Sequence, residues 1–457
     1  MYDCKTLDLL PQGWRDGLGH GSCTRPLEPA AGRTGGAAAP SSKNGFEIVD
    51  ALEYEGRGQK RVMNADLFRW ARETSGLSLD QAASVLDIKD VERLHAIEMG
   101  EEEPSRPLLL KMAKQYRRPL VTFYLPVPPR KGDRGEDFRT LPENRSIAAD
   151  ALLDALIRDV KARQAVVRSL AEDDDEAAPL AFVGSRSMRN SVEVVLASIK
   201  STLAIDIADY RRQRTAEDAF SYLRNKAESA GIFVLLIGNL GSHHSAIAVE
   251  TFRGFAIADK FAPFVIINDQ DAKTAWSFTL MHEITHLWLG TTGISGTSTE
   301  QAIERFCNEV ASSYLLPHGE LDTLRIDDEM PPEELIQLIS SFANARHLSR
   351  KMVAYALFRS GQLSQAVWSR LDRTLDDLWL RERAERKEKE KLSESGPNYY
   401  VVRRYHLGRA LLNLVDRSIG AGTLTPVKAA KVLGVKPRSV YPLLMTSGHS
   451  GTTGTKG

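Results

Sequence analysis

The segment TLMHEITHLWLG, Thr279 to Gly290, carries two histidines four positions apart, with a glutamate directly after the first. Residues four apart share one face of an α-helix, so His282 and His286 can direct ring nitrogens at a single metal ion. Glu283 lies beside them and can reach a metal-bound water without being a ligand. The segment therefore predicts a helix, ended by Gly290, with two zinc ligands and a general base.

A chain of this composition is expected to contain the H-E-x-x-H pattern by chance roughly 0.03 times. The pattern therefore suggests a metal site but does not by itself establish one. Its surroundings favour a metal site. An apolar stripe separate from the histidines runs along the same helix, formed by Trp276, Leu280, Ile284, Leu287 and Trp288. The segment FAPFVIIND ahead of the helix is predicted to be an edge strand suited to holding an extended peptide.

A hydrolytic zinc site needs a third protein ligand and leaves its fourth position to water. A motif extended by a glycine and a third histidine is excluded, because Leu289 and Thr292 occupy those positions. The segment TSTEQAIERFCNEVASSYLLP predicts a second helix instead. Thr297 and Glu300 form a capping box at its start, and Pro317 ends it.

Glu304 and Asn308 lie one turn apart on this second helix, away from its apolar face. We assign Glu304 as the third ligand, with Glu309 as a competing candidate on a different face. Asn308 is expected to orient a ligand histidine by accepting a hydrogen bond from its other ring nitrogen. Tyr314 and His318 are candidates for binding substrate or a developing oxyanion, although a packed tyrosine and a helix-end residue are the simpler interpretations.

These residues resemble the ImmA/IrrE family of zinc metallopeptidases, whose members pair an H-E-x-x-H helix with a later E-x-x-A-N-x-F-A-x-x-L-L-x-P helix. Here FTLMHEITHLWLG is followed by IERFCNEVASSYLLP, so that Glu304 and Asn308 match the family's Glu and Asn. Cys307 replaces the usual Ala and Val310 the usual Phe, and neither change is expected to touch the chemistry. FRGFAIAD and FAPFVIIND are similar to the strands that precede the active helix.

The resemblance extends over most of the chain from Met63 to about Leu444. LFRWARETSGLSLDQAASVLDI and the segments after it, up to FYLPVPP, look like the XRE-type helix-turn-helix of longer members, in which DFRTLP also recurs. The Tyr399–Leu444 tail is similar to their C-terminal segment. The resemblance implies a cytoplasmic, zinc-dependent endopeptidase that cuts a partner transcriptional repressor, and some members are encoded beside toxin-like genes.

We therefore expect a predominantly helical α+β protein, with a helix-turn-helix bundle, a zincin-like core containing a small sheet, and a helical C-terminal region. Short strands are predicted at GIFVLLIG, SAIAVET, RGFAIAD and FAPFVIIND. The expected divisions are a disordered or non-native extension (1–62), the XRE-like domain (63–130), a helical connection (131–204), the zincin-like metallopeptidase domain (205–330), a helical region with a charged linker (331–396), a basic helical segment (397–446) and a disordered tail (447–457). His243 and His244 are interpreted as loop residues.

Composition excludes several classes of protein. The net charge is zero, so any nucleic acid or membrane would have to meet a local patch. Three scattered cysteines do not make a disulfide framework, which favours a reducing cytoplasm. No apolar run approaches the length of a membrane span, and we expect no membrane partner.

Two segments are candidates for DNA binding. Residues 63–125 hold nine basic and ten acidic residues, a net charge of −1, with Lys89 and Arg93 on the third helix beside three acids. Residues 398–444 hold eight basic residues and one acid, a net charge of +7, with Lys436 and Arg438 around a helix–glycine turn–helix pattern. The basic residues have a second interpretation, as a packing face against acidic parts of the same chain.

Two further hypotheses about function stay open at this stage. The chain could be a non-enzymatic helix-turn-helix regulator, with the zincin fold as a structural core, or an antitoxin-like partner of a neighbouring toxin. The intact Glu283 argues against a purely structural site, which has no use for a general base.

Overall fold

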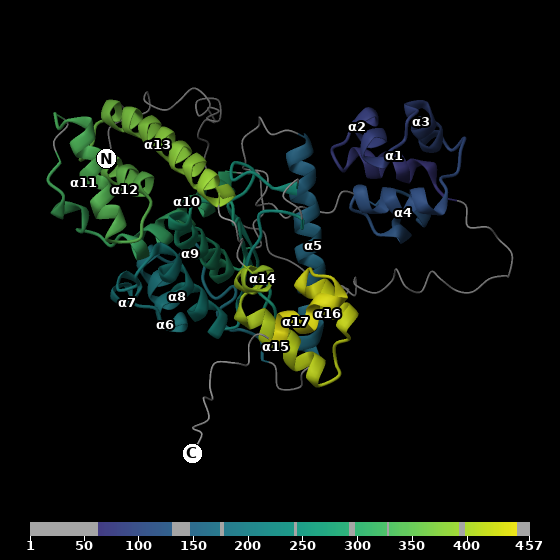
Figure 1. Ribbon diagram of the computed structural model, residues 1–457. Coiled ribbons are helices and arrows are strands. Elements are labelled where there is room, and N and C mark those ends of the chain that lie inside the picture. Colours follow the sequence, from purple (N-terminus) through teal and green to yellow (C-terminus); the bar gives the residue numbers. More distant parts are fainter. Residues whose placement is uncertain are drawn as a thin grey trace, which may run out of the picture. The chain divides into compact units, whose positions relative to one another are not determined.

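The computed structural model describes residues 63–129, 147–173, 178–241, 245–291, 298–326, 329–392 and 398–445. These residues are mostly helical, with one three-stranded sheet (Figure 1), which confirms the expected predominantly helical α+β class. The predicted N-terminal extension, the DFRTLP segment, His243, His244, the Thr297 cap and the C-terminal tail lie outside the described residues. None of the helices in these ranges is long and apolar enough to cross a membrane.

The N-terminal helices form a bundle with its own apolar core. Its elements are α1 (Ala65–Glu73), α2 (Leu79–Leu86), α3 (Val91–Met99), α4 (Arg106–Gln115) and the 3-10 helix η3 (Leu120–Tyr124). Ser78 and Gln81 form a reciprocal capping box at the start of α2, and Gly100 ends α3 at φ 80°. The predicted cap at Ser78 and the predicted helix end at Gly100 are confirmed.

A second set of helices surrounds the sheet. It comprises α5 (Ile147–Glu172), α6 (Val192–Leu203), α7 (Ile207–Arg211), α8 (Ala216–Ser229), α9 (Lys273–Leu289), α10 (Ser298–Leu315), η5 (Leu321–Thr323), α11 (Pro332–Asn344), α12 (Arg350–Arg359), α13 (Gln365–Leu392), α14 (Tyr399–Leu407), α15 (Arg409–Gly420), α16 (Pro426–Leu433), η6 (Pro437–Ser439) and α17 (Val440–Met445). The charged stretch after Arg381 continues α13 as helix to Leu392.

The sheet has the strand order β1-β3-β2, where β1 is Phe233–Leu236, β2 is Gly254–Ile257 and β3 is Phe264–Ile267. β1 pairs parallel with β3, and β2 pairs antiparallel with it. The prediction that FAPFVIIND forms an edge strand is therefore wrong, because β3 lies in the centre. All four β3 residues are buried, and an apolar run on both faces suits a central strand.

The predicted strand at SAIAVET is also wrong. Ala246 makes an isolated bridge to Asn239, Ile247 and Ala248 have no regular structure, and a turn begins at Val249. Apolar alternation over so few residues does not fix a strand unless a neighbouring strand offers a partner.

The sheet separates two apolar cores, because successive side chains of a strand point to opposite faces. Val234, Val265 and Ile267 face the core built with α6, α8, α9, α10 and the helices α11 to α13. Leu235, Phe264 and Ile266 face the core built with α5 and the C-terminal helices α14 to α17. The helix with the histidine pair and the basic C-terminal segment thus share the same three strands from opposite sides.

A buried ion pair fastens the C-terminal helices to the rest. Arg224 and Glu228 lie one turn apart on α8, 3.1 Å from each other, each only 5% exposed. Arg224 also donates to backbone carbonyls of β1 and of the end of α14, while Glu228 accepts from the N–H groups of Arg409 and Ala410 at the start of α15. Burial raises the pKa of Glu228, and the Arg224 charge and these N–H donors oppose that rise.

Gly408 lies where this ion pair meets the backbone. Its φ is 78°, and a Cβ there would lie 2.0 Å from Glu228 Oε1 and 2.7 Å from Arg224 Nη2. A side chain cannot be placed at this position without moving the pair.

Replacing Glu228 with alanine should destabilise the protein by about 3–5 kcal/mol, because Arg224 would stay buried without its carboxylate and α15 would lose its cap. Chemical denaturation followed by tryptophan fluorescence measures the change. The matched control is Glu172→Ala, which breaks an exposed Arg168–Glu172 pair of the same spacing and should cost less than about 1 kcal/mol. Equal losses in the two variants would contradict the structural role of the buried pair.

Candidate metal centre

Helix α9 is buried along most of its circumference. Trp276, Leu280 and Ile284 belong to the core against the sheet, as the predicted apolar stripe requires. Two of the motif residues are also buried, since Glu283 is 5% and His286 1% exposed, while His282 is half-buried. Gly290 ends the helix in the left-handed conformation at φ 67°, as the sequence predicts. Polar groups on such a helix need partners, because an unpartnered buried polar atom is costly.

Helix α10 lies along α9 and supplies the partners. His282 Nε2 is 3.2 Å from Glu304 Oε2, His286 Nε2 is 3.3 Å from Glu304 Oε1, and the two Nε2 atoms are 3.1 Å apart. Glu309, the competing candidate, is exposed. The structure therefore brings together His282, His286 and Glu304.

The two Nε2 atoms lie close enough to each other, and each to one oxygen of the Glu304 carboxylate, for these groups to share a cation. Ligand atoms about 2.0–2.1 Å from a tetrahedral zinc ion lie roughly 3.3–3.4 Å from one another. Two imidazole nitrogens and a carboxylate oxygen are also a donor set that suits zinc. His282, His286 and Glu304 could hold such an ion with little change of side-chain position.

Each histidine has a second contact that fixes its ring. His282 Nδ1 is 3.0 Å from Asn308 Oδ1, and His286 Nδ1 is 3.2 Å from Thr291 Oγ1. With Nδ1 protonated and donating to these oxygens, each ring presents the lone pair of Nε2 toward Glu304. Asn308 occupies the position expected from the sequence. Thr291 was not anticipated, although its place just after the helix-ending Gly290 is a signal that could have found it.

The site favours an ionised Glu304 and a neutral His286. Burial alone would raise the pKa of the Glu304 carboxyl, but hydrogen bonds and charge interactions with the two histidines outweigh it and hold that pKa well below its usual range. Burial lowers the pKa of His286, which the nearby Glu304 only partly offsets. These are the protonation states in which both groups can bind a metal ion.

Glu283 faces the first residue of the edge strand β2. A Cβ on Gly254 would lie 3.0 Å from Glu283 Oε1 and 2.5 Å from Thr279 Cγ2, so the strand approaches α9 closely at this point. Glycine allows this approach because it has no side chain. The carboxylate next to the histidine pair is thus close to the backbone of the strand at the open edge of the sheet.

Cys307 lies closer to the site than the sequence suggests. Its side chain is fully buried, and its Sγ lies within 4.8 Å of a ring nitrogen of each histidine. This replacement of the family's Ala therefore places a thiol near the histidine pair. The signal available in the sequence is its spacing of three residues from Glu304, which puts both on nearly the same side of α10.

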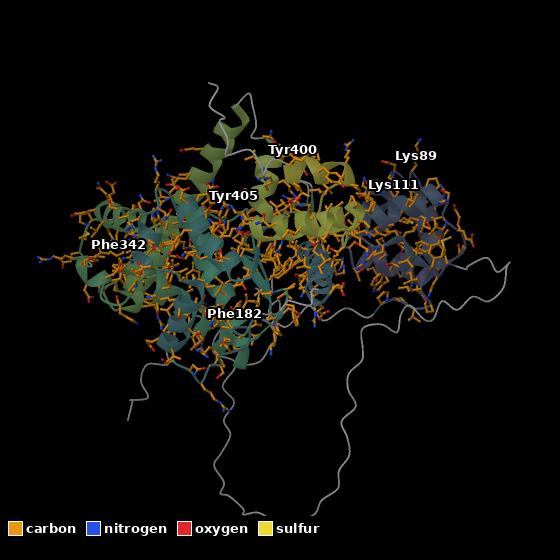
Figure 2. All side chains as sticks on the ribbon, turned by 90° about the horizontal axis from the view of Figure 1, so that it is seen from below. Lys89, Lys111, Phe182, Phe342, Tyr400 and Tyr405 are labelled. Carbon is orange, nitrogen blue, oxygen red and sulfur yellow. The ribbon has the colours of Figure 1, made fainter. Side chains whose placement is uncertain are left out.

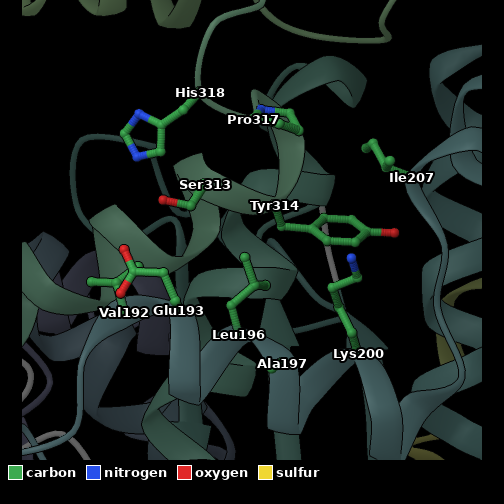
Figure 3. Close-up of a pocket in the computed structure, with 10 residues that line it drawn as sticks. All are labelled: Val192, Glu193, Leu196, Ala197, Lys200, Ile207, Ser313, Tyr314, Pro317 and His318. Atoms are coloured by element: carbon green, nitrogen blue, oxygen red, sulfur yellow. The ribbon is translucent and has the colours of Figure 1, made fainter.

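Tyr314 and His318 lie apart from the metal centre. They line a cavity of about 460 Å³ between α6 and the end of α10, together with Glu193, Lys200 and Ser313 (Figure 3). Ten residues of helix separate Tyr314 from Glu304, a rise of about 15 Å, and the hydroxyl of Tyr314 points away from His318. Burial raises the pKa of the Tyr314 phenol, which stays protonated. The helical rise separates Tyr314 from the metal ligands, and the assignment of Tyr314 and His318 to substrate binding stays a prediction.

The four residues singled out for DNA binding are exposed. Lys89 projects from the N-terminal bundle (Figure 2), while Arg93 on α3 forms an ion pair with Glu102 at 2.7 Å. Lys436 and Arg438 lie in the turn between α16 and α17. Glu98, counted among the acids of α3, is turned inward and paired with Arg72 at 2.7 Å.

Comparison with known proteins agrees with this geometry. The family model of the IrrE N-terminal-like domain (Peptidase M78) matches residues 231–358, a range that runs from β1 into α12 and contains every residue of the metal centre. It does not reach the N-terminal bundle or the C-terminal helices. No curated protein and no solved structure matches the chain. Residues 231–358 are therefore similar to a metallopeptidase domain of the ImmA/IrrE type.

Proposed function

We propose that the chain is a zinc-dependent endopeptidase of the ImmA/IrrE type, which hydrolyses a peptide bond in a protein substrate. The observation that carries the proposal is the meeting of His282, His286 and Glu304 at separations of 3.1–3.3 Å, with Glu283 directly beside them. A structural zinc site has no use for an acid–base group, whereas a catalytic site needs one beside its ligands.

The contacts suggest a role for each residue of the site. When bound, zinc supplies a Lewis acid that polarises the scissile carbonyl and lowers the pKa of water. His282, His286 and Glu304 hold the ion, while Asn308 and Thr291 keep the two rings in the binding orientation. Glu283 accepts the proton of the attacking water and can then return it to the leaving amine.

The sheet edge suggests how a substrate would be held. Within the described residues β2 pairs only with β3, so its outer edge can accept an extended peptide by strand addition. Gly254 at the start of β2 would bring that peptide's backbone close to Glu283. As the resemblance implies, we propose a transcriptional repressor as the substrate, a toxin-like neighbour as a further partner and the cytoplasm as the compartment.

The purified full-length protein should bind one zinc ion per chain, and His282→Ala with His286→Ala should abolish this binding. Mass spectrometry of metal content measures the stoichiometry. Asn308→Ala should weaken zinc affinity by about 10–100-fold, because the His282 ring loses the group that orients it. The matched control, Glu309→Ala on the same helix, should bind zinc normally. A protein that stays folded and takes up no zinc would contradict the proposed site.

Zinc binding should be lost on acidification, because protons compete for the histidine nitrogens. The pKa of His286 is lowered, so it stays neutral at a pH where an exposed histidine, with a pKa of about 6.5, is already half charged. Affinity should therefore be constant near neutral pH and fall below about pH 6. Competition with a chelating dye across pH measures this. Binding that strengthens as the pH falls would exclude histidine ligands.

Glu283→Gln should keep zinc and stop cleavage, because the amide cannot accept the proton. Mass spectrometry of newly formed N-termini, compared between cells that express the wild-type protein and cells that express the variant, identifies substrates. We expect termini that occur only with the wild type. Identical termini with both proteins, while both bind zinc, would overturn the proposed mechanism.

A further inference from the structure

We propose that the C-terminal segment formed by α15, α16 and α17 is a helix-turn-helix that binds duplex DNA, with α17 in the major groove. This function is separate from the proposed peptidase activity, because no residue of the metal centre belongs to the segment. In Figure 1 the segment is the yellow group of helices, where α16 lies against α5.

The turn has the construction of a helix-turn-helix. Three residues, Gly434 to Lys436, separate α16 from η6, which leads directly into α17. Such turns usually have three or four residues and a glycine. Gly434 has a φ of 59°, and a Cβ there would lie 2.3 Å from Arg163 Nη2. Arg403 donates to the carbonyls of Leu433 and Gly434 and fixes the turn.

The three helices contribute to one apolar core, which they share with α5 and one face of the sheet, and α16 contacts both α15 and α17. Small side chains on α16 let its neighbours approach closely, and larger ones from α15 and α17 fill the space. The buried members are Leu411, Leu412, Val415, Ala429, Ala430, Val432, Leu433, Val440, Leu443 and Leu444. Because the burial of Val440, Leu443 and Leu444 fixes the rotation of α17, its opposite side faces solvent.

The exposed residues on that side come from η6 and α17. Arg438, Tyr441, Pro442 and Met445 are spaced by three, four and seven residues and are all exposed, with Tyr441 at 47% and Met445 at 74%. Tyr441 and Met445 are therefore available on this side for contact with a partner. The major groove, about 12 Å wide, admits one helix and offers both base edges and thymine methyl groups for contact.

The charge around this face suits phosphates. Lys428, Lys431, Lys436 and Arg438 are exposed, and among the residues the structure describes none of them forms a salt bridge. The single acid of residues 398–445 is Asp416. The interpretation of these cations as a packing face against acidic parts of the chain therefore fails for the four exposed side chains, which are placed to meet the DNA backbone.

The N-terminal bundle offers a weaker surface for DNA. On α3, Arg93 is paired with Glu102, Glu92 is exposed and Asp90 caps the helix. A phosphate approaching α3 would meet acids and a cation that is already neutralised. This contrast assigns the DNA contact to the C-terminal segment.

The test uses the protein with Glu283→Gln, which removes the proposed peptidase activity, and a fluorescein-labelled duplex of mixed sequence about three helical turns long. Fluorescence anisotropy measures affinity between about 50 and 200 mM salt. Lys436→Gln with Arg438→Gln should weaken binding at least about tenfold and reduce the slope of log affinity against log salt by about 1.8, since each phosphate contact contributes about 0.9. The matched control, Lys89→Gln with Arg93→Gln, makes the same change of charge in the other bundle and should alter affinity by less than about twofold.

Three results would overturn the proposal. One is an equal loss of affinity in both double variants, and another is loss in the N-terminal variant alone. The third is the absence of duplex binding together with binding to phosphatidylserine vesicles, which would identify a membrane surface instead. Lys436→Arg with Arg438→Lys keeps the charge and should retain affinity, which separates a charge effect from a folding defect. Thermal unfolding of all variants checks that the segment is intact.

Discussion

The cost of burying polar side chains on α9 shapes much of the structure around it. A helix enclosed by the sheet and by α10 carries two histidines and a glutamate, and such groups are stable inside a protein only with partners. Glu304 of α10 contacts both histidines, and Asn308 of α10 contacts His282. Thr291, just after α9, contacts His286. The same contacts that stabilise the helix also preorganise three donor atoms for a cation, so stability and function depend on one interface.

Most residues of this site could be predicted from local patterns in the sequence. Spacing of three and four residues put His282 with His286 and Glu304 with Asn308, because residues one turn apart share a face whatever the fold is. Caps at Ser78, Gly100 and Gly290 gave helix ends for a similar reason. Each of these inferences needs only the geometry of a single helix.

Other features depend on contacts between distant segments, which local patterns do not specify. The apolar run of β3 fits an edge or a centre until its two partners are known, and SAIAVET has strand-like alternation without a strand to pair with. The nearness of Cys307 to the histidines appears only once α10 lies against α9. The same limit applies to charge. The surplus of basic residues near the C-terminus was evident, but which of them are exposed follows only from packing.

The sheet has one consequence for how the protein can be divided. The sheet has three strands of four residues, and both of its faces are apolar. One face is covered by α5 and the C-terminal helices. Removing residues 398–457 would uncover Leu235, Phe264 and Ile266. It would also remove the α14 carbonyls that Arg224 binds and the α15 N–H groups that Glu228 binds, and would leave Arg224 bonded to the β1 carbonyl alone among its backbone partners. An isolated fragment that ends after α13 would therefore be prone to aggregate. The C-terminal segment that contains the basic residues therefore packs against the same sheet as the helix with the histidine pair.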